Sequence, residues 1–369
     1  MQKTSIRYPK FTVLGCGNSS QALAARISLM GCSVNLGTLP GFAKRLEAIQ
    51  AQGGIMVSDA HGEKFAPLEQ VSSSIEELVG QAEIIFVAVP AYRHELFIRA
   101  MAPCLHDGQF VVFCSHFGAM NFNFLMREMQ IRAEVTAVES LSFLYASRRT
   151  GPASVKIFAT RKSLPVAALP YSRTGAFLEK VSNVFPQMNA AENVLFTSLN
   201  NSGPVLQTPL LVLNAARTEY TKGREWNIFS EGFTHAVARV VLQVEKERAA
   251  VARNLGVTNI PLTESLKHII PTKGLTPETL SGAIMANPVL ASPEMASPAS
   301  LRDRFISESV PFGLVPWCSI AHRHSIPVTV MTSLISLTSA MNEVDYFREG
   351  LSAEKLGIVA EGERPGMEL

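Results

Sequence analysis

Two glycines near the start of the chain have the spacing of a phosphate-binding turn. Gly15 and Gly17 follow the apolar run Phe-Thr-Val-Leu (11–14), and the turn segment 15–22 runs into a helix-forming stretch over residues 23–30. In such a strand–turn–helix arrangement the first glycine permits a tight turn. The second lets the backbone approach a pyrophosphate, whose charge the amides of the helix N-terminus attract. The position of the usual third glycine holds Ser20, a small residue, so the pattern indicates dinucleotide binding.

A glycine pattern alone is weak support, because a purely structural corner between a strand and a helix has the same sequence. Two further features favour the nucleotide. An apolar strand is expected at 33–36, about twenty residues after the turn, and the apolar run at 84–90 marks the end of a later parallel strand. Together they make a nicotinamide cofactor the leading interpretation. The residues expected to contact it are Gly15, Gly17, Asn18, Ser19, Ser20, Gln21, Thr38, Val89, Pro90 and His116. For His116 a plain loop position is an equal alternative.

The end of the second strand bears on the choice between NADH and NADPH. Sites that prefer NAD carry an Asp or Glu there, which binds the ribose 2′-hydroxyl. This chain has Thr38 at that position, followed by Lys44 and Arg45. The missing carboxylate removes repulsion against a 2′-phosphate, and the nearby cations attract it. The sequence therefore predicts that NADP(H) is preferred and that NAD(H) is tolerated.

The elements that must position these residues change in character along the chain. Up to residue 188, short β-rich runs alternate with helical runs, which predicts a doubly wound parallel sheet with helices on both faces. Its strands are expected near 11–14, 33–36, 84–89, 110–114, 134–138, 155–160 and 183–187. From about residue 192, helical periodicity takes over. We therefore predict an α/β fold with an N-terminal Rossmann-type domain (1–188), an all-helical domain (189–369) and a reactive cleft between them.

Three stretches of the helical half invite a more detailed expectation. The apolar stripe over 236–255, followed by Gly256, predicts a long helix with a glycine stop. Five prolines lie between residues 271 and 300, so an irregular excursion is expected there. The least polar stretch, 325–341, is interrupted by Ser and Thr and is too short to cross a bilayer, which favours a buried helix.

The bulk composition is that of a soluble enzyme with a large core. The chain has 369 residues, 47% of them hydrophobic and 17% charged, which exceeds one typical domain. The net charge of +2 argues against nucleic acid as a partner. Five cysteines without CxxC spacing, and a start without the apolar region of a signal peptide, indicate free thiols in the cytoplasm. The histidines have no acidic or cysteine partners at ligand spacing, so no metal site is predicted.

Several segments, in order along nearly the whole chain, resemble the octopine/nopaline (opine) dehydrogenase family. The longest is Phe-Ile-Ser-Glu-Ser-Val-Pro-Phe-Gly-Leu-Val-Pro-Trp-Cys-Ser-Ile-Ala (305–321). The others are the turn at 15–18 and residues 139–148, 230–234, 247–248, 326–328, 334–337 and 350–358. Enzymes of this family condense the amine of an amino acid with a 2-keto acid and reduce the resulting imine with NAD(P)H. The resemblance therefore implies reduction of a C=N bond on a substrate that bears a carboxylate.

Two positions depart from the family's pattern. The family has a His in a segment similar to Asn-Pro-Val-Ile-His-Pro-Pro-Leu and an Asp in Arg-Tyr-x-x-Glu-Asp-Val-Pro, and the two form an acid/base pair. The matching segments here are Gly-Pro-Val-Leu-Gln-Thr-Pro-Leu (203–210) and Arg-Phe-Ile-Ser-Glu-Ser-Val-Pro (304–311), which place Gln207 and Ser309 at those positions. Glutamine can hydrogen-bond a substrate but cannot supply a proton near neutral pH.

Two other residues are candidates for substrate chemistry. Arg304 stands where the family's arginine binds the keto-acid carboxylate, a task that suits a guanidinium. Its alternative is a surface or interdomain salt bridge. His235, at the start of the long helix, is a candidate replacement for the missing acid, and a buried or helix-capping histidine is its alternative.

Three functions remain open at this point. Hydride delivery to an already protonated iminium needs no enzymic acid, which favours an imine reductase acting on a preformed or cyclic imine derived from an amino acid. An NADP-dependent hydroxy-acid or keto-acid dehydrogenase would need a proton donor such as His235, because charge then develops on oxygen. The third is a catalytically inactive homologue that binds the cofactor. The expected partner is a small carboxylated molecule and neither nucleic acid nor a membrane, and a homodimer is left open.

Overall fold

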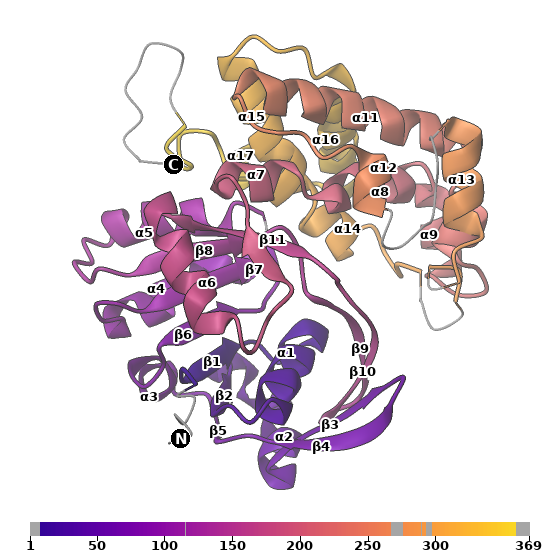
Figure 1. Cartoon of the computed structure of the whole chain (residues 1–369). Helices are drawn as coiled ribbons and strands as arrows, with labels where there is room; N and C mark the ends of the chain where they lie inside the picture. Colours follow the sequence, from indigo (N-terminus) through magenta and orange to yellow (C-terminus); the bar gives the residue numbers. More distant parts are fainter. Residues whose placement is uncertain (1–7, 115, 267–275, 289, 293–296, 359–369) are drawn as a thin grey trace. The chain divides into compact units, whose positions relative to one another are not determined.

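The computed structural model describes residues 8–114, 116–266, 276–288, 290–292 and 297–358 (Figure 1). The chain forms two compact units that divide between Thr197 and Ser198, within the short helix α7 (Val194–Leu199). The predicted boundary at 188/189 lies inside strand β12 (Met188–Ala190), which pairs with a strand of the first unit. The first unit therefore extends further along the chain than the sequence pattern indicates.

The first unit is built on an eight-stranded sheet with the order β12-β11-β8-β7-β6-β1-β2-β5. Its remaining strands are β1 (Phe11–Leu14), β2 (Val34–Gly37), β5 (Gln70–Ser72), β6 (Ile84–Val87), β7 (Phe110–Cys114), β8 (Thr136–Ser140) and β11 (Leu164–Leu169). Every residue of β1, β2 and β6 is buried, and successive side chains point to opposite faces, so both faces of the sheet centre are covered. All neighbours are parallel except β8 and β11. The predicted Rossmann-type sheet is thus confirmed, with an antiparallel pairing near one edge.

The helices of the first unit connect these strands. They are α1 (Asn18–Leu29), α2 (Glu47–Gln52), α3 (Ile75–Gly80), α4 (His94–Met101), α5 (Gly118–Glu128) and α6 (Thr174–Val181). The strand predicted at 183–187 is wrong. Val184 and Phe185 are buried in a turn after α6, and their amides bond to the carbonyl of Val181. A short apolar run fits a buried turn as well as a strand, which explains the error.

A second, four-stranded sheet belongs to the same unit and has the order β4-β3-β10-β9. Its strands are β3 (Gly54–Asp59), β4 (Gly62–Pro67), β9 (Tyr145–Gly151) and β10 (Ser154–Thr160). The predicted strand at 155–160 therefore exists as β10 but does not join the main sheet. Buried Val155 and Ile157 alternate with more exposed neighbours, a pattern typical of a sheet with one covered face.

All regular secondary structure of the second unit is helical within its described residues. Its helices are α8 (Ser202–Val212), α9 (Ala215–Thr221), α10 (Ile228–Gly232), α11 (His235–Asn254), α12 (Leu262–Leu266), α13 (Pro277–Met285), α14 (Arg304–Ser307), α15 (Val315–Arg323), α16 (Thr329–Asn342) and α17 (Tyr346–Glu349), with a π-helical turn, η5 (Val310–Leu314). The predicted all-helical domain is confirmed. No helix in the described part of the chain is long and apolar enough to cross a membrane.

Local signals account for the helix boundaries in this unit. The long helix α11 begins where the Thr234 side chain accepts the amide of Val237, and Gly256 follows its end with φ +68°. Helix α13 lies between residues 271 and 300, so the prediction that this stretch is an irregular excursion is wrong for residues 277–285. Thr276 caps it and Pro277 occupies its first position, where proline is favoured because no amide is needed there. Residues 267–275, 289 and 293–296 of this stretch lie outside the described residues.

The apolar stretch at 325–341 forms α16, as predicted, but the helix is not wholly buried. Met331, Leu334 and Ile335 are buried, whereas Leu337 and Met341 are exposed. One face of α16 therefore packs into the unit and the other does not.

Candidate active site

The glycine turn lies at the centre of the main sheet, where the strand order reverses direction. From β1 the chain builds β2 on one side and β6 on the other, and ligands bind beside the carboxyl ends of strands at such a point. Gly15 has φ +122°, and a Cβ atom there would lie 2.7 Å from the carbonyl oxygen of Ala88 and 2.9 Å from Val89 Cγ1. Only glycine fits this turn, because any side chain would collide with Ala88 and Val89, which directly follow β6.

The start of α1 suits a pyrophosphate. Gly17 is its N-cap and, among the described residues, no side chain caps it and its first turn has no acidic residue. The first amides of α1 are thus left to a ligand, with the positive end of the helix dipole behind them. Ser20 is buried and donates to the carbonyl of Gly17 at 3.2 Å, so it stabilises the turn from within. These residues fit a dinucleotide.

The other predicted residues of the turn have different surroundings. Asn18 is exposed, and its Oδ1 accepts the backbone amide of Arg149 at 3.0 Å. Gln21 is fully buried, and its Nε2 donates to the carbonyls of Pro152 at 3.0 Å and Cys16 at 3.4 Å. Gln21 therefore ties the glycine turn to the turn between β9 and β10, and its contact with the cofactor stays a prediction.

Strand ends supply the remaining predicted cofactor residues. Thr38 is buried directly after β2, and Val89 is buried after β6, where Pro90 precedes the turn η2 (Ala91–Arg93). A small pocket opens at the carboxyl ends of β6, β7 and β8, and Ser19 is part of its wall together with Ala88, Cys114 and Ser140. This pocket lies where the fold is expected to hold a ligand.

Two histidines lie close together beside this pocket's strands. His116, with φ +65°, and Phe117, with φ +57°, are consecutive left-handed residues after β7, a conformation that is uncommon for residues other than glycine. His94, at the start of α4, is buried against Phe113 with ring centroids 5.1 Å apart. Burial, and secondarily the nearby His116, lowers the pKa of His94 to about 3, opposed by a hydrogen bond with the Val89 backbone. Sequence reasoning missed His94, since only its position shortly after β6 could have indicated it.

Gln207 and Ser309, the two residues predicted to stand at the family's acid/base positions, contact each other in the second unit. The Ser309 hydroxyl donates to Gln207 Oε1 at 2.9 Å. Ser309 is buried just before η5, and Gln207 is half-buried on α8. Because Oε1 accepts this bond, the amide orientation is fixed, and Nε2 has no hydrogen-bond partner among the described residues. The pair therefore presents one oriented amino group, Nε2, whose two N–H donors are available to a substrate.

Close packing holds the two side chains at this distance. A Cβ atom on Gly313 of η5 would lie 2.3 Å from Cγ of Pro204 on α8. The backbone of η5 therefore packs directly against the proline ring of α8. The Thr208 hydroxyl, on α8, donates to the Phe305 carbonyl of α14 at 3.3 Å. The π-helical turn after Ser309 is a feature often found at functional sites.

Arg304 and His235 occupy exposed positions at helix starts. Arg304 is the first residue of α14, and its guanidinium forms no hydrogen bond or ion pair with any described residue. It remains available to a carboxylate ligand. His235 is the first residue of α11, and no hydrogen bond joins it to Gln207 or Ser309. The structure therefore brings Gln207 and Ser309 together and does not bond His235 to them.

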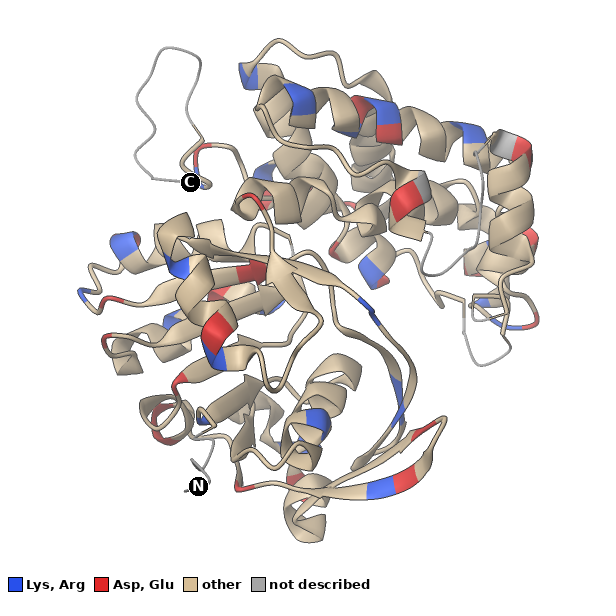
Figure 2. Ribbon diagram, viewed as in Figure 1, with Lys and Arg blue, Asp and Glu red and all other residues tan. Residues whose placement is uncertain are grey.

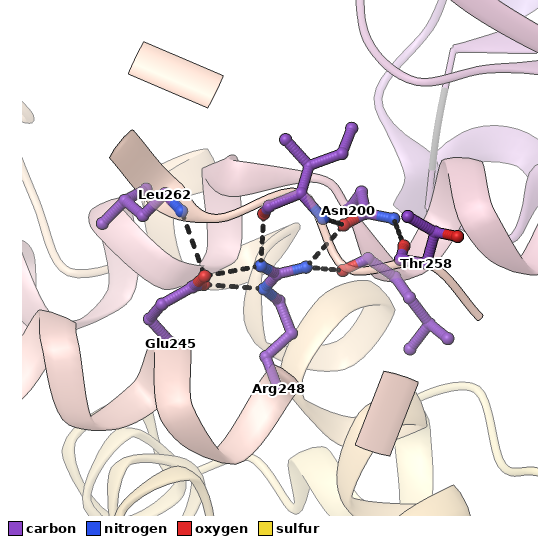
Figure 3. Close-up of polar contacts among 7 residues, drawn as sticks. Asn200, Glu245, Arg248, Thr258 and Leu262 are labelled. Atoms are coloured by element: carbon purple, nitrogen blue, oxygen red, sulfur yellow. Dashed lines mark hydrogen bonds and ion pairs between the residues drawn. The ribbon is translucent and has the colours of Figure 1, made fainter. Parts of the chain in front are cut away.

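Arg248, in a segment that carried the family resemblance, has a structural role. Its side chain is 2% exposed and makes a two-pronged ion pair with Glu245, both contacts at 2.8 Å (Figure 3). It also donates to the carbonyl of Ile260 at 2.9 Å and to Asn200 Oδ1 at 3.1 Å. The buried charge is thus fully partnered and joins α11 to two loops of the second unit.

Glu247, the neighbour of Arg248, binds the N-terminus of another helix. Its carboxylate accepts the amides of Val330 and Met331, both at 2.9 Å. These amides belong to the first turn of α16, so Glu247 caps that helix and complements its dipole. Across the described ranges, no three His, Cys, Asp or Glu side chains are arranged to hold a metal ion.

Comparison with known proteins yields matches over both units. The model of the α-helical domain of NAD/NADP octopine/nopaline dehydrogenases matches residues 190–342, and the ketopantoate reductase PanE/ApbA model matches residues 11–116. An opine dehydrogenase from Arthrobacter sp. (strain 1C) is 31% identical over 350 residues, covering 94% of this chain and 95% of that protein.

Two solved structures have a similar fold. Octopine dehydrogenase with NADH and L-arginine has a TM-score of 0.77 at 18% identity, over 95% of this chain and 96% of that chain. Yersinopine dehydrogenase with NADP+ bound has a TM-score of 0.72 at 14% identity, over 95% of both chains.

Proposed function

This chain belongs to the opine dehydrogenase family and is an NAD(P)-dependent oxidoreductase acting on CH–NH groups, and we propose that its substrate is a preformed or cyclic imine bearing a carboxylate. The observation that carries this proposal is the hydrogen bond from Ser309 to Gln207. At the positions where the family resemblance implies an acid and its orienting carboxylate, this chain has a hydroxyl and an amide in contact. The contact supports a site that orients a substrate and transfers no proton.

The chemistry of the two side chains restricts the reaction. Neither an amide nor a hydroxyl supplies a proton near neutral pH, so dehydration of a carbinolamine or reduction of a ketone would proceed without an enzymic acid. An iminium carries its proton already, and its reduction develops no charge on oxygen. A substrate that arrives as an iminium is therefore compatible with Gln207 and Ser309 as they stand.

Each residue of the site then has a defined task. Gln207 donates through Nε2 and positions the substrate, while Ser309 fixes the orientation of that amide. Arg304 binds the substrate carboxylate, because a guanidinium free of internal partners can form a two-pronged contact with it. The octopine dehydrogenase structure with L-arginine supports an amino-acid-derived substrate class.

The first unit supplies the cofactor site, for which we propose NADPH as the preferred occupant. Gly15, Gly17 and the start of α1 would hold the pyrophosphate, and the bound nicotinamide supplies the hydride. Thr38, in place of an acidic residue at the end of β2, supports the phosphorylated form. Relatives have been solved with NADH and with NADP+, so the family accommodates both.

Oxidation of NADPH with three substrate types tests the proposed function. We expect turnover with a cyclic imino acid such as 1-piperideine-2-carboxylate, and none with pyruvate alone or with pyruvate and an amino acid at neutral pH. Turnover of the keto acid alone would instead identify a hydroxy-acid dehydrogenase. Cofactor binding without turnover on a broad panel of imines and ketones would identify an inactive homologue.

A further inference from the structure

Three cations line an open hollow on the first unit. Lys44 and Arg45 come from the turn η1 (Pro40–Arg45), and Arg149 comes from strand β9 of the second sheet. The hollow has a volume of about 490 Å³, and small or uncharged residues complete its wall: Ala48, Thr150, Gly151 and Pro152. Among the described residues no carboxylate lines the hollow, so the charges around it are of one sign.

These three cations have no acidic partner among the described residues. Lysines and arginines are interspersed with aspartates and glutamates along the ribbon (Figure 2), and some of them form ion pairs, such as Arg26 with Asp59 at 3.1 Å. Within the described residues, none of Lys44, Arg45 and Arg149 forms an ion pair. Three like charges around one hollow repel each other, and a bound anion would relieve that repulsion.

Hydrogen bonds join this hollow to the cofactor turn. The backbone amide of Arg149 donates to Asn18 Oδ1 at 3.0 Å, and the Ser147 hydroxyl donates to the Asn18 carbonyl at 3.3 Å. Asn18 is the first residue of α1, directly after Gly17. Arg149 is therefore held beside the phosphate-binding turn although it lies on a different sheet.

The other wall of the hollow begins just after β2. Strand β2 ends at Gly37, Thr38 follows, and η1 starts at Pro40. In a dinucleotide-binding sheet the adenosine ribose lies at this strand end, beside the glycine turn. The hollow thus adjoins the place where the ribose 2′ position of a bound dinucleotide is expected.

We propose that this hollow binds the 2′-phosphate of NADPH and that Arg149, supplied by the second sheet, is a determinant of cofactor specificity. The inference rests on the proposed use of NADP(H) and extends it to a residue distant from the nucleotide-binding fingerprint. A phosphate dianion matches the three cations in charge, and the Arg149 guanidinium can bind two of its oxygens at once. Lys44 and Arg45 contribute charge from the opposite wall.

Strand β9 itself offers a matched control variant. Arg149 pairs with buried Val155 and shares its face of the sheet, whereas the neighbouring Arg148 pairs with Lys156 on the other face. Arg148 does not line the hollow. Arg149→Gln and Arg148→Gln therefore remove the same charge from adjacent positions, only one of which faces the proposed phosphate.

The test measures dissociation constants by calorimetry for NADPH, NADH, 2′,5′-ADP and 5′-AMP. The full chain binds 2′,5′-ADP more tightly than 5′-AMP if the proposal holds. Arg149→Gln should weaken NADPH and 2′,5′-ADP by about tenfold to a hundredfold, the range expected for a lost charge-assisted bond, and leave NADH and 5′-AMP within about twofold. Arg148→Gln should leave all four unchanged.

Several results would overturn the proposal. One is an equal loss of NADH and NADPH affinity in Arg149→Gln, and another is an equal effect of Arg148→Gln. Equal affinity of the wild-type protein for NADH and NADPH would also overturn it. The proposed imine reduction would not be affected, because NADH could then supply the hydride. Conversely, a failed search for imine turnover leaves these binding constants intact, so the two proposals fail separately.

Discussion

Ser309 and Gln207 lie 102 residues apart in the chain, yet their side chains share a hydrogen bond of 2.9 Å. The bond joins the residue before η5 to the middle of α8, so each side chain fixes the orientation of the other. A substitution at either position alone leaves the other side chain without its hydrogen-bond partner. The two positions are therefore expected to behave as a unit under mutation.

The double substitution Gln207→His with Ser309→Asp should create an acid and its orienting carboxylate in hydrogen-bond contact. We expect condensation of a keto acid with an amine to become detectable as NADPH oxidation, because an imidazole can supply the missing proton. Gln207→His alone should give a much smaller rate, since no carboxylate would hold its ring. A double variant no more active than the single variant would show that other features of the pocket block condensation.

The pH dependence of kcat/KM should follow the pKa of the substrate imine. No acid or base is assigned to the site, so the profile should shift when an imine of different pKa is used and should lack a step near 6.5. The measurement is kcat/KM for two imines between pH 5 and 9. If the profile stays fixed for both substrates and its step disappears in His235→Ala, then His235 is a proton donor after all.

Arg304→Leu should raise the KM for the imine by about tenfold to a hundredfold, because a charge-assisted contact with the carboxylate is lost. Cofactor affinity should not change. Arg302→Leu is the matched control, since the Arg302 guanidinium already donates to the carbonyl of Asn342 at 3.0 Å. An unaltered KM in Arg304→Leu would remove this residue from the substrate site.

Arg248→Met should lower the free energy of unfolding by about 3–5 kcal/mol, because Glu245 would keep a poorly solvated charge without its partner. Urea denaturation is the direct measurement. Arg253→Met, at an exposed position at the end of the same helix, should change stability by less than about 0.5 kcal/mol. Similar losses in both variants would mean that the Arg248 contacts contribute nothing specific.

His94 should make stability sensitive to acid. Its pKa is about 3 in the folded protein, mainly through burial, and about 6.5 in an unfolded chain. The unfolded state therefore takes up the proton first. The contribution that uncharged His94 makes to the free energy of unfolding is fully present above pH 6.5 and falls as the pH drops from there toward 3. Wild-type protein should lose about 1 kcal/mol more per pH unit in this window than His94→Leu. His61→Leu, an exposed control, should keep the wild-type slope.

The main sheet could be predicted from the sequence because its central strands carry their own signal. β1, β6 and β7 are nearly uninterrupted apolar runs bounded by turn residues, as expected for strands covered on both faces. The second sheet carries no such signal. β4 reads Gly-Glu-Lys-Phe-Ala-Pro and is mostly exposed, and β9 contains two adjacent arginines. Such polar edge strands are defined by their partners, which local patterns do not reveal.

The same limit applies to the candidate site. The glycine turn is local and could be predicted, and the fit of Gly15 against Ala88 agrees with it. That Gln207 and Ser309 belong together was implied by the family resemblance alone, since their contact depends on how η5 packs on α8. Arg149 could not be assigned to the cofactor side, because its position follows from the pairing of β9 with β10.

The pairing of β10 with β3 determines when the second sheet can be completed as the chain is synthesised. The β3–β4 hairpin can close as soon as its residues are synthesised, but the free edge of β3 waits for Ser154, Val155 and Lys156 to arrive from a segment made much later. Until then this edge is open to wrong partners, and such delayed contacts are slow to form. The hollow that contains Arg149 exists only once this gap is closed. NADPH bound in this hollow, as proposed, would therefore stabilise the chain with a completed second sheet over the chain in which the edge of β3 is still open.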